Sequence, residues 1–447
     1  MNPNTADIVA KLWKECKTLQ SAGISYSNYV NELTYLLFLK MLEETKQENR
    51  LPNGHCWSKL SGLEGGDQLE YYKSMLLELG NPRKTTDRVT LAIFTDAMTH
   101  LRLPKDLKTL TTNIDKLDWF SAREDGLGDL YEGLLEKTTS ATKSKAGQYF
   151  TPRALIDSII RLVKPEHGEV IQDPAAGTGG FLIAADRFIK DKTDDLFKLT
   201  DSEAHFQRHQ AFVGHEWVPD THRLCVMNML LHGIESLVEC ADSCAPQGEN
   251  LGQASLILTN PPFNKMSGNV NRVDFTLTAG ERVGPMPFLE HAIRSLKKGG
   301  RCAIVMPDNI LFGDGVGTEL RRFLMVNCDL HTILRLPTGI FYAQGVKTNV
   351  MFFTRTTDKV LPANHDKYAT KNVWFYDLRS NMPSFGKTNA LTAKHFEEFE
   401  KLYGSDPLGG SKRKEGDEES RWRKLSRKQI AERGDNLDWT WLRDESG

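Results

Sequence analysis

The first 145 residues carry apolar side chains at intervals of three and four, the spacing that places them on one face of an α-helix. This pattern begins at Ile8, Leu12, Trp13, Cys16 and Leu19 and returns in residues 29–41, 69–79 and 91–101. Glycine and proline breaks separate these stretches. The pattern predicts an all-helical N-terminal domain over residues 1–145, with a short polar hinge at residues 143–147.

From residue 146 the pattern changes to short β-rich runs that alternate with amphipathic helices. Strands are predicted at residues 169–173, 211–216, 255–260, 301–306, 330–336 and 347–354. Helices are predicted at residues 180–190, 220–232, 288–298 and 317–326. Such alternation is typical of a doubly wound α/β fold with a mainly parallel sheet. We assign this second domain to residues 146–400 and interpret the charge-dense residues 401–447 as a polar C-terminal tail.

The composition adds three constraints to this picture. Hydrophobic residues make up 39% and charged residues 26% of the chain, an ordinary globular balance, and the apolar stretches are too short to span a membrane. The seven cysteines are odd in number and scattered, which favours reduced thiols in the cytoplasm over a disulfide framework or a metal site. The net charge of −2 lacks the basic excess of a protein that grips DNA alone.

The strongest local motif occupies residues 173–181, with the sequence D-P-A-A-G-T-G-G-F. An apolar strand leads into Asp173, then a glycine-rich turn, then a helix, and ligands bind at such strand ends in open parallel sheets. The turn consists of Gly177, Thr178, Gly179 and Gly180, and its glycines let the backbone approach a ligand closely. The turn has neither the Lys-Ser/Thr pair of a phosphate loop nor the spacing of a dinucleotide fold. A purely structural turn is the alternative.

Two further acidic residues extend this interpretation. Glu216 ends the next predicted strand, where an acid can accept hydrogen bonds from the two ribose hydroxyls of a cofactor. A solvated acid at a strand end is the alternative for that residue alone. Asp242 follows a possible third strand and is a candidate partner for the adenine amine of the same cofactor.

The chemistry is indicated by Asn260, Pro261, Pro262 and Phe263, which stand at the end of the apolar strand predicted at residues 255–260. An aromatic amine is a poor nucleophile because its lone pair is delocalised into the ring. The Asn260 side-chain oxygen and a neighbouring backbone carbonyl can accept its two N–H groups and stabilise the developing positive charge. The prolines hold these acceptors rigid, and Phe263 offers a face for a flipped base. The alternative is a proline-rich turn.

Two other segments keep two interpretations each. Thr151 is predicted as the N-cap of a helix whose first residue is Pro152, and the same helix N-terminus can bind the carboxylate of a cofactor. Residues 264–285 are a long loop with lysine and arginine side chains, either a mobile lid over DNA or a solvated loop.

Taken together, these motifs resemble the modification (methyltransferase) subunit of type I restriction–modification systems, a family of N6-adenine DNA methylases. The resemblance covers nearly the whole chain. It includes further blocks at residues 12–13, 31–33, 131–135, 147–152, 336–341 and 347–350.

The resemblance implies a Rossmann-like methyltransferase sheet, mostly parallel with one antiparallel strand, preceded by the helical domain. It implies S-adenosylmethionine as cofactor, with contacts from Gln148, Tyr149, Phe150, Thr151, Pro152 and Arg153, and from Thr178, Gly179, Gly180 and Glu216. Asn260 to Phe263 would receive adenine, without a metal. The implied partners are double-stranded DNA, a specificity subunit, a second modification subunit and a restriction subunit that can join. The net charge of −2 is consistent with a partner subunit that supplies many of the contacts to DNA.

Three alternatives remain at this point. Cytosine N4 and a protein glutamine amide are planar nitrogens that suit the same four residues. A non-catalytic assembly subunit that retains the cofactor fold is the third, although intact Asn260 and Glu216 argue against it.

Overall fold

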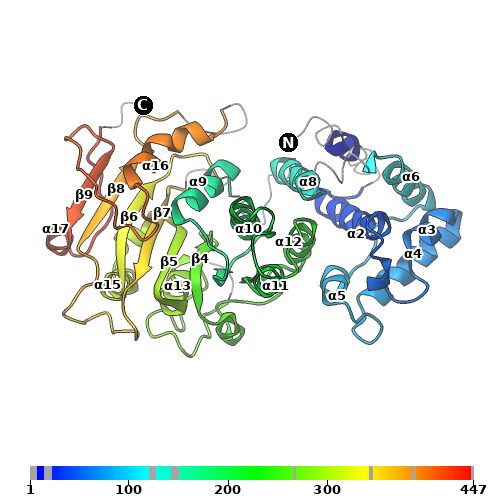
Figure 1. Cartoon of the computed structure of the whole chain (residues 1–447), viewed down its shortest axis with the longest axis horizontal. Helices are drawn as coiled ribbons and strands as arrows, with labels where there is room; N and C mark the ends of the chain where they lie inside the picture. Colours follow the sequence, from blue (N-terminus) through cyan, green and yellow to red (C-terminus); the bar gives the residue numbers. More distant parts are fainter. Residues whose placement is uncertain are drawn as a thin grey trace. The chain divides into compact units, whose positions relative to one another are not determined.

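The computed structural model describes residues 8–14, 23–119, 127–141, 151–264, 268–341, 346–383, 385 and 389–443. The chain packs as two compact units (Figure 1). One consists of Met1–Lys145 with Val218–Leu237, and the other of Ala146–Trp217 with Val238–Gly447. Over the described part of the chain, we find no helix with the length and apolarity needed to cross a bilayer.

The first unit is helical, as predicted. Besides helical residues 8–14 and the short η1 (Glu48–Arg50), it contains α2 (Tyr26–Glu44), α3 (Trp57–Gly62), α4 (Gly65–Leu79), α5 (Arg88–Phe94), α6 (Pro104–Asp115), α8 (Leu127–Ala141) and α12 (Pro219–Leu231). The central helix α2 contacts α3, α6, α8 and α12 and is buried nearly all round, for example at Leu33, Phe38 and Leu39. A helix that is apolar on every side forms the centre of a core.

Helix α12 packs in the first unit although its chain neighbours belong to the second. The buried Arg223 donates hydrogen bonds to the carbonyls of Ile93 (2.7 Å) and Thr95 (3.0 Å) at the end of α5. Asp220 accepts from Asn31 in α2 at 3.0 Å. The last carbonyls of a helix need external donors, and Arg223 supplies them. The predicted domains are continuous stretches of the chain, and the order of residues along the chain does not show which hydrophobic core a helix joins. The domain bounds stay a prediction.

The second unit is built on a nine-stranded sheet in the order β3-β2-β1-β4-β5-β7-β6-β8-β9. The strands are β1 (Ile171–Asp173), β2 (Phe212–His215), β3 (Val238–Glu239), β4 (Ala254–Thr259), β5 (Leu296–Pro307), β6 (Cys328–Arg335), β7 (Thr348–Arg355), β8 (Asn372–Asp377) and β9 (Trp422–Ser426). The strands from β3 to β5 are parallel, whereas β7 runs antiparallel between β5 and β6. The predicted fold class is confirmed, with β7 antiparallel as expected, and β9 at the edge of the sheet is a second antiparallel strand.

The charge-dense C-terminal segment is not simply a polar tail. Residues 422–426 form β9, which pairs antiparallel with β8, and Trp422 stacks on Trp374 with ring centroids 5.1 Å apart. Helix α17 (Arg427–Glu432) follows, with Ile430 buried. The expectation of a tail was wrong for this stretch because a few buried apolar residues are sufficient to anchor an edge strand whose other side chains are charged.

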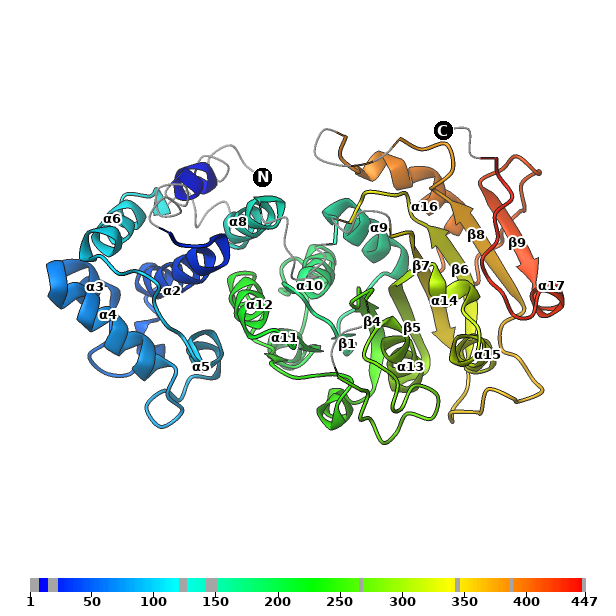
Figure 2. The same ribbon diagram turned by 180° about the vertical axis from the view of Figure 1, so that it is seen from behind.

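Helices cover the sheet on two sides (Figures 1 and 2). On one side α9 (Arg153–Val163) packs against α10 (Gly180–Thr193) and α16 (Glu397–Tyr403), and on the other α13 (Pro285–Ser295) packs against α15 (Val316–Asn327). The remaining short elements are α11 (Asp201–His209), α14 (Asn309–Phe312), η2 (Pro246–Leu251) and η3 (Ala393–Phe396). Because β1, β2, β3 and β4 are parallel, the residues that follow them share one edge of the sheet.

Candidate functional site

The turn after β1 brings the predicted glycines and the first acid together. Gly177 (φ 56°) and Gly179 (φ 82°) adopt left-handed conformations, which glycine enters without strain, and Gly179 is the N-cap of α10. Asp173 is buried and its Oδ1 accepts a hydrogen bond from the Ala175 amide at 3.0 Å. Burial raises the pKa of the Asp173 carboxyl to about 7, and the charge of Glu216 acts in the same direction. A nearby cation would therefore favour ionisation of this carboxyl.

Glu216 contacts the glycine turn directly. Its Oε2 accepts a hydrogen bond from the Gly177 amide at 3.0 Å. Strand β2 can approach β1 this closely because Gly214 has no side chain. A Cβ at this position would lie only 2.6 Å from the Asp173 carbonyl oxygen. The structure thus places together the two features that the sequence assigned separately to a cofactor. A carboxylate offers about four acceptor positions, so the Gly177 bond orients Glu216 and leaves acceptor capacity for other donors.

Asp242 lies in the loop after β3, half buried, and its Oδ1 accepts a hydrogen bond from the Cys244 amide at 2.8 Å. This bond forms a local turn that stabilises the loop. The neighbouring Ser243 donates a hydrogen bond of 2.7 Å to the Pro174 carbonyl, directly after Asp173. The loops that carry Asp173 and Asp242 are therefore joined.

Asn260 follows β4 and is held by Thr151, the residue before the N-cap of α9. Its Nδ2 donates a hydrogen bond of 2.9 Å to Oγ1 of Thr151. Among the described residues, no hydrogen-bond donor reaches the buried Oδ1 of Asn260. An unsatisfied buried acceptor is unfavourable by about 1–3 kcal/mol, so this atom is poised to accept a donor from a ligand.

The predicted capping role of Thr151 is not observed. Pro152 is the N-cap residue of α9, which has no side-chain cap, and the Thr151 hydroxyl instead accepts from Asn260. The preference of threonine for N-cap positions is a local rule, whereas its partner here is 109 residues away. Arg153 is the first residue of α9. Gln148, Tyr149 and Phe150 lie outside the described residues.

Phe263 is buried against an aromatic residue from a second loop. The rings of Phe263 and Phe341 have centroids 5.4 Å apart and planes at 83°, an edge-to-face contact. Pro261 is buried and Pro262 half buried between Asn260 and Phe263. Phe341 follows β6, so two loops fix the orientation of the Phe263 ring. In the sequence, Phe341 stands out only as part of a family block, because edge contacts between distant loops leave no local pattern.

The loop after these residues is tied to the fold in its described part, residues 268–285. Asn269 and Arg282 form an antiparallel bridge, and the Glu290 carboxylate accepts from the amides of Thr276 and Thr278 at 2.8 Å each. Glu290 itself is fully buried. Buried acceptors therefore hold part of the backbone of this loop, while many of its side chains are exposed. The lid and the solvated loop both stay predictions.

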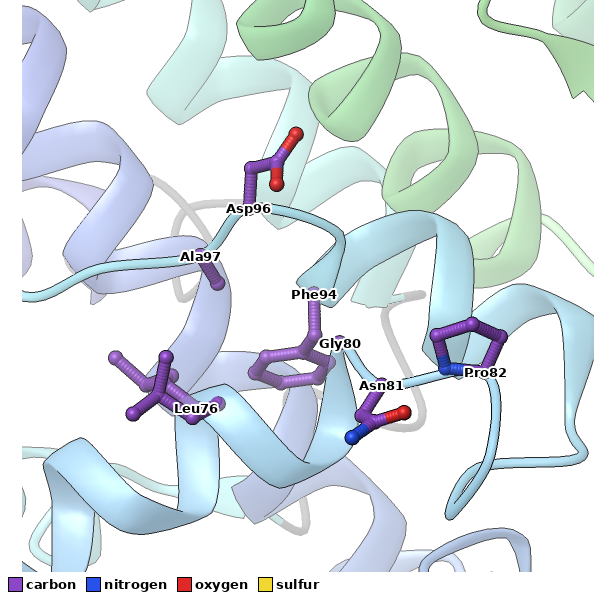
Figure 3. Close-up of a pocket in the computed structure, with 8 residues that line it drawn as sticks. Leu76, Gly80, Asn81, Pro82, Phe94, Asp96 and Ala97 are labelled. Carbon is purple, nitrogen blue, oxygen red and sulfur yellow. The ribbon is translucent and has the colours of Figure 1, made fainter.

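Two features of the first unit stand apart from the predicted residues. Asp129, Glu132 and His232 offer three metal-capable ligand atoms within 4.8 Å of one another. A hollow of about 280 Å³ is lined by Leu76, Leu77, Gly80, Asn81, Pro82, Phe94, Asp96 and Ala97 (Figure 3). The sequence predicts neither feature, since both combine residues from separate helices and loops.

The comparison with known families decides the assignment. The family described as N-6 DNA Methylase matches residues 122–441, which include every described site residue named above for the second unit. The chain belongs to this family.

Relatives of this N-6 DNA methylase are type I restriction enzyme subunits. The EcoKI methylase subunit of Escherichia coli (strain K12) is 48% identical, over 99% of this chain and 89% of the relative. The crystal structure of the EcoKI M protein superposes with a TM-score of 0.62 at 45% identity, covering 98% and 90% of the two chains. A methyltransferase subunit from Streptococcus thermophilus shares the fold, with a TM-score of 0.71 at 20% identity over 97% and 98%.

Proposed function

We propose that this N-6 DNA methylase transfers the methyl group of S-adenosylmethionine to N6 of an adenine that has been flipped out of double-stranded DNA. The observation that carries the proposal is the arrangement of Asn260, whose amide nitrogen is engaged by Thr151 while its buried Oδ1 lacks a donor among the described residues. An adenine amine supplies such a donor.

The residues after β1 and β2 fit the proposed cofactor. Gly177 and Gly179 carry no Cβ where the backbone would approach it, and Glu216 is oriented by the Gly177 amide for hydrogen bonds from ribose hydroxyls. The buried Asp173 and the loop with Asp242 border the same edge. When bound, S-adenosylmethionine would supply an electrophilic methyl group on a sulfonium sulfur. The S–C bond would break as the N–C bond forms, S-adenosylhomocysteine would leave, and the methylated amine would lose one N–H proton.

The chain's own residues then position and polarise the amine. Asn260 Oδ1 and the Pro261 carbonyl accept its two N–H groups, which favours a pyramidal nitrogen with an available lone pair. Phe263, held edge-on by Phe341, stacks on the flipped base. Holding the two reactants in line provides most of the rate enhancement.

We further propose that the chain works as the modification subunit of a complex. The relatives are named as subunits of type I restriction enzymes, and the net charge of −2 provides no basic excess for gripping DNA alone. The proposed partners are a specificity subunit that reads the DNA site, a second copy of this chain and a restriction subunit. A cytoplasmic location is supported by the free thiols of the described cysteines, four of which are buried.

The proposal is tested by methyl transfer from labelled S-adenosylmethionine to DNA, with and without the specificity subunit, followed by mass spectrometry of the modified base. N6-methyladenine that appears only with the partner would support both the chemistry and the division of labour. Methylation by the chain alone would contradict the proposed dependence on a partner. N4-methylcytosine, or no transfer in a verified complex, would overturn the proposed reaction.

A further inference from the structure

Each of the three predicted cofactor acids is the chain neighbour of a residue in one buried polar cluster. Pro174 follows Asp173, His215 precedes Glu216, and Ser243 follows Asp242. The cluster is completed by Arg272, His291 and Gln172, and Gln172 directly precedes Asp173. The acids are thus attached to a common framework rather than to three independent loops.

Ser243 is the junction of this framework. Its side chain donates a hydrogen bond of 2.7 Å to the Pro174 carbonyl and lies 3.2 Å from Nδ1 of His215. Because its one hydroxyl proton is used on Pro174, Ser243 Oγ accepts from His215. The residue is 3% exposed, so no bulk water substitutes for these bonds. A single hydroxyl therefore links the chain segments that carry Asp173, Glu216 and Asp242.

Arg272 connects the junction to the loop that begins with Asn260. One of its terminal nitrogens donates to the Ser243 carbonyl at 3.0 Å and lies 3.3 Å from Nδ1 of His291. The edge of the guanidinium formed by Nε and Nη2 donates two hydrogen bonds of 2.7 Å to the Asp274 carboxylate. His291 Nε2 lies 2.6 Å from the Gln172 side-chain oxygen in β1. Since arginine only donates, His291 accepts from Arg272 and donates to Gln172.

A glycine beside Ser243 and the charge states of the cluster's side chains both permit these hydrogen bonds. A Cβ at Gly248 would lie 2.3 Å from the Arg272 nitrogen and 2.2 Å from the Ser243 carbonyl oxygen, so the junction requires glycine there. Burial, together with the Arg272 charge, lowers the pKa of His215 to about 4 and that of His291 to about 3. Both rings are neutral at pH 7, and the Arg272 charge is balanced by Asp274. A satisfied buried network of this kind is rigid.

We infer that Ser243 and Arg272 are positioning residues for the cofactor site, which set the spacing of Asp173, Glu216 and Asp242 and link it to the Asn260 loop. The inference rests on the proposed function, because it assumes that these acids bind S-adenosylmethionine. A merely structural cluster would affect folding stability alone. A positioning cluster also affects cofactor affinity, since a hydrogen bond weakens steeply when its partners move apart.

The test measures S-adenosylmethionine binding to the full chain by calorimetry, for wild type, Ser243→Ala and Ser380→Ala. Ser380 is a matched control, a buried serine whose hydroxyl donates 2.9 Å to Asp377 at the end of β8. We expect Ser243→Ala to raise Kd and the KM for the cofactor about tenfold, while kcat and the KM for DNA in the assembled complex change less than about twofold. Ser380→Ala should lower Tm without changing Kd.

Three results would overturn the inference: an unchanged Kd in Ser243→Ala, an equal loss of affinity in Ser380→Ala, or a proportional loss of kcat and of DNA affinity. If Ser243→Ala does not fold, Arg272→Lys decides, because it retains the charge balancing Asp274 while losing the planar fork that reaches Ser243. The same rise in Kd is then expected, and an unchanged Kd contradicts the inference. If wild-type protein itself binds no S-adenosylmethionine, the proposed function fails instead.

Discussion

Nδ2 of Asn260 donates a hydrogen bond of 2.9 Å to Oγ1 of Thr151, so the residue that follows β4 is held by the residue before the N-cap of α9. This bond fixes the orientation of the Asn260 amide, with Nδ2 directed toward Thr151 and Oδ1 directed away from it. With the nitrogen engaged, the oxygen is left to accept from a ligand. Two segments that a sequence reader treats as separate motifs therefore act as one unit.

Loss of the Thr151 hydroxyl should weaken catalysis without weakening cofactor binding. In Thr151→Val the side chain keeps its shape but cannot accept from Asn260, whose amide is then free to rotate. We expect kcat to fall about tenfold, the effect of one lost orienting hydrogen bond. Thr151→Ser retains the hydroxyl and should stay close to wild type. Equal activity in the two variants, measured by label transfer to DNA, would show that the bond does not orient Asn260.

Removal of the Asn260 side chain should lower turnover strongly. Asn260→Ala deletes the acceptor for the adenine amine, and loss of such a preorganised group lowers kcat by about 10²–10³-fold. Calorimetry should show nearly unchanged S-adenosylmethionine binding. Asn53→Ala, at an exposed turn of the first unit, serves as the control and should be active. A loss of cofactor affinity as large as the loss of turnover would indicate a structural role.

The Glu216 carboxylate should contribute to cofactor affinity. Glu216→Gln removes the charge and replaces one acceptor oxygen by a donor, so hydrogen bonds from ribose hydroxyls weaken. We expect Kd for S-adenosylmethionine to rise at least about tenfold, since hydrogen bonds to charged groups contribute about 1.5–3 kcal/mol. Glu249→Gln replaces an exposed glutamate and should leave Kd unchanged. The prediction is wrong if both variants bind equally well.

The contact between Phe263 and Phe341 should matter for the DNA substrate more than for the cofactor. Phe341→Leu removes the aromatic edge that fixes the Phe263 ring, and aromatic pairs contribute about 0.5–1.5 kcal/mol beyond their buried area. We expect kcat/KM for DNA to fall several-fold with an unchanged Kd for S-adenosylmethionine. Phe312→Leu alters a partly exposed phenylalanine and should have little effect. If the Kd for S-adenosylmethionine changed instead, Phe341 would contribute to cofactor binding and the prediction would be wrong.

Stability should depend on pH through Asp173. Burial raises its pKa from 3.8 to about 7, so the folded state binds this proton more tightly than the unfolded chain does. The stabilisation is complete below pH 3.8 and is lost as the pH rises to about 7, with a slope of at most about 1.4 kcal/mol per pH unit. In urea unfolding of the cofactor-free protein, Asp173→Asn should be more stable relative to wild type at pH 8 than at pH 5.

A second buried carboxyl provides the comparison for that measurement. Burial also raises the pKa of Glu32, in the first unit, to about 7, and its carboxylate accepts from the His100 amide at 2.6 Å. Glu32→Gln should therefore remove a similar pH dependence without affecting the second unit's cofactor binding. If Asp173→Asn leaves the pH dependence of unfolding unchanged, the Asp173 carboxyl is ionised throughout that range.

The sequence by itself determined the parts of this protein that depend on residues close together in the chain. Apolar runs that lead into polar residues predict strands β1, β2 and β4. They also predict Asp173, Glu216 and Asn260 at or directly after the strand ends, and parallel strands bring such ends to one edge. The left-handed glycine turn after β1 is likewise local, because only backbone conformation and the absence of a Cβ are involved. The family resemblance rests on the same short blocks.

The tertiary structure alone decided which distant residues meet. Helix α12 joins the core of the first unit through Arg223, and the charge-rich residues 422–426 complete the sheet as β9. Thr151 contacts Asn260 across 109 residues, and Ser243 joins the neighbours of the three acids. These partners are buried or half-buried polar groups. In a hydrophobic pattern, a polar residue that will form a buried hydrogen bond looks the same as one that will face solvent. Only the packed fold, which removes water and supplies a single partner, distinguishes the two.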